Sequence, residues 1–146
     1  MNNKDLDRLR KVFEHAEKST YTTFHGKPIQ MAAGVWEGNK FITLTCNENK
    51  THPLQLKYNT GSKEVSEKPR ANLHAEMKAI VELYKRGDVN ASKCTVYIAR
   101  RQSGNKSKAG LARPCPACMS ALRDIGIKQF CYTTEEGYMT ETITEV

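Results

Sequence analysis

Two short motifs contain the residue types from which a catalytic zinc site is built. The first, NLHAEMKAI, places the carboxylate of Glu76 beside the imidazole of His74, and the second, ARPCPACMSAL, contains the thiols of Cys115 and Cys118. One imidazole and two thiolates leave the fourth position of a tetrahedral zinc open, as catalytic zinc requires. A carboxylate that is not a ligand can then carry protons between a water at that position and a substrate. The motifs therefore predict a zinc site with three protein ligands and Glu76 as the proton carrier.

A zinc that only stabilises the fold would need a fourth protein ligand. The other histidines, His15, His25 and His52, are not spaced like a partner for the two cysteines. Cys131 could supply a fourth sulfur, but it lies in a segment that is predicted to be a strand. The sequence therefore favours a catalytic zinc over a structural one.

The elements that must position these residues can be read from hydrophobic periodicity. Helical spacing covers residues 4–18, 72–87 and 114–125, and strand-like runs cover residues 29–36, 40–46, 93–99, 128–133 and 138–143. Gly38-Asn39 predicts a hairpin turn, and Asn72 is the expected N-cap of the second helix. Strands that alternate with helices indicate a layered α/β domain. Both metal motifs fall at predicted helix N-termini, where the helix dipole favours thiolates.

Length and composition limit the class of protein. The chain of 146 residues fits one domain over 1–146, with a helix and connection in 1–25 and a long substrate-side loop in 47–70. No apolar run is long enough to span a membrane, and the charged N-terminus lacks an apolar signal core. Five cysteines, an odd number, argue against a disulfide framework. We therefore expect a cytoplasmic protein, or one in a host cytoplasm if the gene belongs to a phage.

The pair of motifs, H-x-E followed by P-C-x-x-C, is the signature of zinc nucleobase deaminases. On these motifs the chain resembles the cytidine/deoxycytidylate deaminase superfamily over about residues 29–135. The resemblance implies a three-layer α/β fold with a mixed five-stranded sheet and helices on both faces. It also implies hydrolytic deamination, one Zn²⁺ per subunit and a homo-oligomer. In that reaction Glu76 moves a proton from water to the ring nitrogen of the substrate.

Substrate contacts are predicted at five further residues. The resemblance implies that Asn47, or else its neighbour Asn49, contacts the sugar, although an asparagine here could simply make the turn after its strand. Ala75 is small enough to let a base approach the metal, and His52 is a candidate at the pocket mouth, where a solvated loop histidine is the alternative. Arg113 and Pro114, next to the second metal motif, complete the set.

The formal net charge of +7 is unevenly distributed. Residues 89–123 contain seven bases and no acid, whereas residues 129–146 contain four acids and no base. A basic stretch around a metal motif suits a phosphate-bearing substrate, and a solvated surface without a partner is the alternative. The candidate phosphate contacts are Lys57, Arg70, Arg100, Arg101 and Arg113.

The predicted reaction converts a cytosine nucleoside or nucleotide, such as CMP or dCMP, to the uracil form with release of ammonia. The alternative is a polynucleotide deaminase that acts on cytosine or adenine in single-stranded DNA or tRNA, for which the basic charge is suitable. Single-strand binding usually combines a basic groove with aromatic side chains, and residues 100–113 contain no aromatic residue. A zinc-stabilised binding module is disfavoured because it would not need Glu76.

Overall fold

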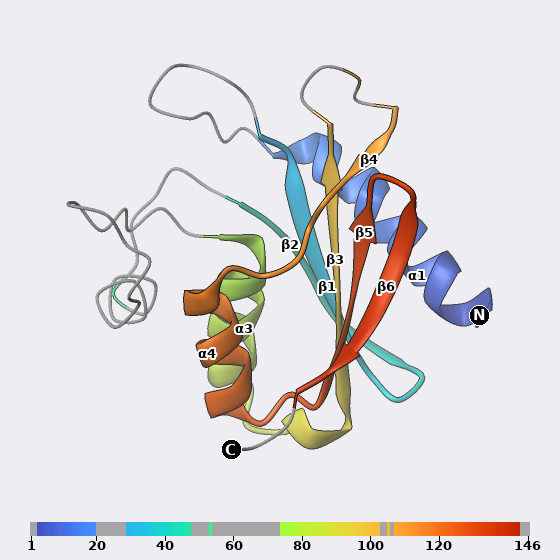
Figure 1. Cartoon of the computed structure of the whole chain (residues 1–146). Helices are drawn as coiled ribbons and strands as arrows, with labels where there is room; N and C mark the ends of the chain where they lie inside the picture. The colour runs from blue at the N-terminus through green and yellow to red at the C-terminus, as the bar shows by residue number, and fades with distance from the viewer. Residues whose placement is uncertain are drawn as a thin grey trace.

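The computed structural model describes residues 3–19, 29–47, 53, 74–102, 105 and 107–143. Within this part of the chain, one mixed sheet separates helix α1 on one face from α3 and α4 on the other (Figure 1). The elements are α1 (Asn3–His15), the 3-10 turn Ala16–Lys18, β1 (Met31–Glu37), β2 (Lys40–Cys46), α3 (Ala75–Lys85), the 3-10 turn Ala91–Lys93, β3 (Cys94–Arg101), β4 (Ala109–Gly110), α4 (Pro116–Ile125), β5 (Gln129–Thr134) and β6 (Gly137–Thr142). This arrangement confirms the predicted three-layer α/β fold.

The strand order is β2-β1-β3-β5-β6, and the two-residue strand β4 pairs with β3 as a sixth strand. All pairings are antiparallel except β3 with β5, which run parallel. Parallel neighbours need a crossover, which α4 provides here. Because β3 and β5 point the same way, the N-terminus of α4 is brought to the carboxyl end of β3, close to the N-terminus of α3.

Helix α1 packs on its face of the sheet through an apolar stripe that includes Leu9 and Val12. The buried guanidinium of Arg8 lies 5.1 Å from the ring centroid of Trp36 and 5.6 Å from that of Tyr97. It donates hydrogen bonds to the Tyr97 hydroxyl (3.3 Å) and the Gly38 carbonyl (3.0 Å). The Tyr97 hydroxyl in turn donates to a carboxylate oxygen of α1. The buried cation of Arg8 therefore makes its hydrogen bonds within the protein.

The opposite face contains the larger apolar core. Met77 and Ile80 of α3 and Leu122 of α4 are fully buried against Val96 of β3 and Phe130 of β5. Apolar burial of this kind stabilises by about 1.5–3 kcal/mol for each large side chain. The two helices are thereby fixed side by side, with both N-termini at the same end of the sheet (Figure 1).

The predicted helices and strands are confirmed, but most of their ends lie one to three residues from the predicted ones, and β4 is a sixth strand that the predicted five-stranded sheet lacks. Asn72 is not the N-cap of its helix, because His74 takes that position with extended dihedral angles (φ −71°, ψ 155°). The helix predicted from residue 114 begins at Pro116 instead, with Cys115 as N-cap. The stretch 100–113, predicted as a loop, contains the end of β3 and all of β4. Most of the predicted loop 47–70 lies outside the described residues. In the described part of the chain, no helix is both long and apolar enough for a membrane span.

Candidate metal centre

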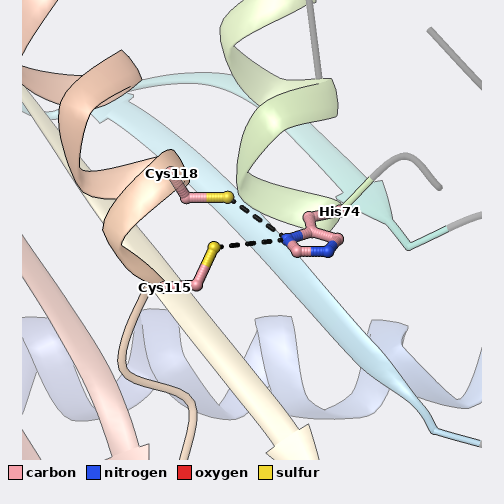
Figure 2. Close-up of side chains that lie close together, drawn as sticks. All are labelled: His74, Cys115 and Cys118. Atoms are coloured by element: carbon pink, nitrogen blue, oxygen red, sulfur yellow. Dashed lines mark hydrogen bonds between the residues drawn. The ribbon is translucent and has the colours of Figure 1, made fainter. Parts of the chain in front are cut away.

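Three donor atoms converge where α3 and α4 begin (Figure 2). His74 Nδ1 lies 3.3 Å from Cys118 Sγ and 3.7 Å from Cys115 Sγ, and all three donor atoms lie within 4.8 Å of one another. A tetrahedral zinc with ordinary Zn–N and Zn–S bond lengths would separate its nitrogen and sulfur ligands by about 3.5 Å. The side chains are therefore spaced like ligands of one tetrahedral ion.

The local backbone explains why these donors meet. His74 and Cys115 are the N-caps of α3 and α4, and Cys118 lies one turn into α4. The carbonyl of each N-cap accepts the first helical hydrogen bond, at 2.9 Å from Lys78 N and at 2.9 Å from Met119 N. Proline at the first position of α4 has the φ that a helix start needs and lacks only an N–H that would be unpaired there. Both ligand positions are thus fixed by helix initiation.

The electrostatics of the cluster suit a cation. A hydrogen bond from Cys118 lowers the pKa of Cys115 to about 4, and the bond to His74 acts in the same direction although burial opposes it. Burial raises the pKa of Cys118 well above its ordinary range, and the neighbouring Cys115 thiolate adds to this effect. Burial lowers the pKa of His74, but the Cys115 hydrogen bond and the Glu76 charge outweigh it. One thiolate is already favoured, and a bound cation would favour the second.

Glu76 is the buried carboxylate of this centre. It is 2% exposed, and its Oε1 lies 3.8 Å from His74 Nδ1. Burial raises the pKa of Glu76, although the His74 charge opposes this shift. A carboxyl whose pKa is moved toward neutrality can exchange a proton in both directions. The helix that carries it is tied to β2, because Thr45 Oγ1 donates to the Ala75 carbonyl at 2.7 Å.

A cavity of about 210 Å³ opens beside the cluster. Its described lining combines apolar, amide and charged side chains: Ile29, Met31, Asn47, His74, Glu76, Arg100, Leu111, Arg113 and Cys115. The carboxylate and two of the metal-type donors therefore face one small space that a substrate could enter.

Comparison with known proteins agrees with this geometry. The family model described as the cytidine and deoxycytidylate deaminase zinc-binding region matches residues 3–134. The chain belongs to this family. A solved structure of cytidine deaminase from Burkholderia pseudomallei matches with a TM-score of 0.60 and 14% identity, covering 93% of this chain and 91% of that chain. At this identity the likeness concerns the fold alone. No match was found among curated proteins.

As a member of this family, the protein is a hydrolytic deaminase of the cytidine deaminase kind. The His74, Cys115 and Cys118 cluster fits one Zn²⁺ per subunit, since its donors are the nitrogen and sulfur atoms that zinc prefers. Among the described residues, neither His15 nor Cys131 belongs to this cluster. Cys131 is buried in the α1 face of the sheet, so it does not supply the fourth sulfur of a structural site.

The predicted substrate residues have different locations in this deaminase. Asn47 and Arg113 line the cavity, whereas Ala75 and Pro114 are buried and are not part of its described lining. His52 lies outside the described residues. Ala75 is 0% exposed, so its small size is used in the core between α3 and the sheet. Two of the five predicted contacts are therefore brought to the cavity.

Asn47 is held by hydrogen bonds to two other segments of the chain, residues 29–31 and Ser19. Its Nδ2 donates to the Ile29 carbonyl at 2.8 Å, and its Oδ1 accepts from Met31 N at 3.2 Å and from the Ser19 hydroxyl. The side-chain amide of Asn47 therefore joins the start of β1 to the end of β2. Neither a turn nor a sugar contact alone describes this structural role. Asn47 also lines the cavity, so the predicted sugar contact is still a prediction.

The candidate phosphate contacts are also separated. Arg101 Nε donates to the Phe13 carbonyl at 3.0 Å, and its guanidinium lies 4.3 Å from the Phe13 ring centroid, on the α1 side. Arg100 and Arg113 line the cavity. Lys57 and Arg70 lie outside the described residues.

Sequence reasoning missed Glu141, which pairs with Arg113 through Nε–Oε2 at 2.8 Å and Nη2–Oε1 at 3.1 Å. It also missed Leu111, which lines the cavity although it is 56% exposed. The one signal for Glu141 was the acidic stretch 129–146 that follows the basic stretch 89–123. Opposite charges in neighbouring stretches predict contact between them, but they do not identify the pair.

Proposed function

We propose that this protein is a zinc-dependent hydrolase that converts a cytosine nucleoside or nucleotide to the uracil form and releases ammonia. His74, Cys115 and Cys118 are the metal ligands, and Glu76 is the catalytic acid and base. The observation that carries the proposal is the 2% exposed carboxylate of Glu76, which faces a small cavity beside three zinc-type donors.

The chemistry can be assigned to the residues of this site. Zinc, when bound, supplies a water molecule whose pKa is lowered toward neutrality. Glu76 would accept a proton from the attacking water at one carboxylate oxygen and donate it to the ring nitrogen of the base, while the water oxygen bonds to the carbon that carries the amino group. The second proton of that water would pass through the same carboxylate to the amino nitrogen, and the C–N bond would break to release ammonia. A carboxyl with a raised pKa suits both steps, because it accepts a proton more readily than an ordinary carboxylate and can still release it.

The volume of the cavity favours a small substrate. Its volume of about 210 Å³ lies below the range of about 300–1,000 Å³ that is usual for sites of drug-sized ligands. Apolar side chains of Ile29, Met31 and Leu111 can contact the faces of a single-ring base, while Asn47 is the predicted sugar contact. The structural relative is a cytidine deaminase, which also favours cytosine as the base.

Several finer assignments accompany this proposal. We expect a homo-oligomer and a cytoplasmic location, and single-stranded nucleic acid is the alternative substrate. The basic lining of the cavity, Arg100 and Arg113, is compatible with a mononucleotide or with the end of a longer strand.

The direct test is ammonia release by the zinc-loaded protein. The substrates are cytidine, deoxycytidine, CMP, dCMP, dCTP, adenosine and a mixed single-stranded oligonucleotide. Turnover of a cytosine monomer that is absent in Glu76→Ala, with zinc content unchanged, is the expected result. Turnover of the oligonucleotide alone would assign the protein to the polynucleotide deaminases instead. Full activity in Glu76→Ala would overturn the proposed mechanism.

A further inference from the structure

Three polar side chains from different elements form a connected group beside the cavity. Arg113, in the segment between β4 and α4, donates two hydrogen bonds to Glu141 of β6, at 2.8 and 3.1 Å. The hydroxyl of Tyr132 on β5 donates to the same carboxylate at 2.6 Å. A two-point bond between guanidinium and carboxylate is among the stronger and more directional polar contacts in proteins. Glu141 is therefore held in one orientation by two neighbours.

This group alters what Arg113 can offer to a ligand. Arg113 lines the cavity together with His74 and Glu76. A guanidinium usually binds phosphate through two parallel N–H groups, and in Arg113 such a pair, Nε and Nη2, is occupied by Glu141. The pair is partly exposed, with 48% of the Arg113 side chain and 29% of the Glu141 side chain accessible. Glu141 is not part of the described lining, so its negative charge acts on a ligand in the cavity from behind the positive charge of Arg113.

We propose that Glu141 is a specificity-determining residue, which keeps Arg113 from a substrate phosphate and so favours neutral cytosine nucleosides over their monophosphates. The inference rests on the proposed function, because it assumes that the cavity takes a cytosine nucleoside or nucleotide. Glu141 neutralises Arg113 and repels a dianionic phosphate, whereas it does not repel an uncharged nucleoside. Tyr132 supports this function as a positioning residue, since it holds the carboxylate in place. Arg100 is the remaining described cation of the lining and would be the phosphate contact if Glu141 had no such effect.

The test compares cytidine with CMP in the wild type, Glu141→Gln, Tyr132→Phe and Glu135→Gln. Glu135 is the matched control because it is an exposed carboxylate in the turn of the same hairpin. We expect the wild type to have the higher kcat/KM for cytidine. In Glu141→Gln, loss of one repelling charge should lower the KM for CMP about tenfold, the effect of a unit charge on a dianion about 6 Å away in a water-like dielectric. The kcat for both substrates and the KM for cytidine should stay within about twofold. Tyr132→Phe should also lower the KM for CMP, by a smaller factor. Glu135→Gln should leave the KM for CMP and the KM for cytidine unchanged.

Binding measurements keep this inference distinct from the deaminase proposal. Calorimetry of cytidine and CMP is made on zinc-loaded Glu76→Ala, with and without Glu141→Gln, where turnover does not interfere. Binding of both ligands without turnover in any protein that retains Glu76 would overturn the deaminase, while the change in affinity ratio would still decide the function of Glu141. An unchanged ratio in Glu141→Gln, or a wild type that prefers CMP, would overturn the specificity proposal. Failure of both ligands to bind any variant would overturn both.

Discussion

Buried polar side chains have different surroundings on the two faces of the sheet. On the α1 face, the guanidinium of Arg8 is hydrogen-bonded to Tyr97 and Gly38. On the α3 and α4 face, Glu76 and Cys118 are buried with raised pKa values, and Glu76 lies 3.8 Å from the imidazole of His74. Buried polar groups whose hydrogen bonds are made within the protein indicate structure, and buried titratable groups with shifted pKa values beside a cavity indicate a functional site.

The comparison predicts its largest effect for the metal ligands. Cys118→Ser should abolish stoichiometric zinc binding and, with it, the stabilisation that zinc gives the native state. That stabilisation is about 4 kcal/mol at a free zinc concentration 1,000 times the dissociation constant. Zinc content measured by atomic absorption and thermal unfolding with and without a chelator test this directly.

Cys131→Ser is the control for that experiment, because it makes the same chemical change at a buried thiol on the α1 face. It should retain zinc. Loss of zinc from Cys131→Ser, or full zinc binding by Cys118→Ser, would contradict the assignment of the metal to the helix N-termini.

The next largest effect is a loss of turnover without a loss of stability. Glu76→Gln should lower turnover by at least about 10²-fold, the contribution of a positioned acid or base, and should retain zinc. Because the change removes a buried carboxylate with a raised pKa, the free energy of unfolding should stay equal or increase. Ammonia release and denaturant unfolding on the same preparation separate the two quantities. A marked fall in stability would mean that Glu76 is a structural residue like those of the α1 face.

The α1 face should show the converse. Arg8→Met should lower the free energy of unfolding by about 2–3 kcal/mol, since it removes hydrogen bonds donated by a buried charged group. Turnover of the folded protein should not change. Arg10→Met, an exposed arginine on the same helix, is the control and should alter stability by no more than about 0.5 kcal/mol. If Arg8→Met lowered kcat without affecting unfolding, the division between the two faces would be wrong.

The smallest effect is expected at the Arg113–Glu141 pair. The hydrogen bond from Arg113, followed by that from Tyr132, lowers the pKa of Glu141. A lowered folded-state pKa stabilises the protein above the unfolded pKa, and this stabilisation disappears as pH falls through the folded pKa. Because the pair is partly exposed, we expect less than about 1 kcal/mol. The difference in the free energy of unfolding between the wild type and Glu141→Gln, measured from neutral to strongly acidic pH, should decrease to zero as the pH falls. A difference that increases with acid would contradict the direction of the shift.

The sequence predicted the parts of the site that depend on local pattern. The ligands and Glu76 belong to short motifs at helix starts, and helix periodicity is a local property. The cap at Asn72 was wrong because His74 itself has the extended backbone of an N-cap. Glu141 and the bonds of Asn47 could not be predicted, because they depend on how β6 pairs with β5 and how three separate segments meet. Long-range register decides such contacts, and a single sequence does not specify it.

The N-caps that hold the metal also determine how the chain can vary. His74 and Cys115 are 41 positions apart, so one bound ion acts as a crosslink that closes a long loop. The entropy of closing a loop changes slowly with its length, by about 0.6 kcal/mol for each doubling. Connecting segments within that loop can therefore gain or lose residues with little effect on the free energy of metal binding. A domain built this way can acquire new substrates by remodelling its connecting segments while its chemical centre stays unchanged.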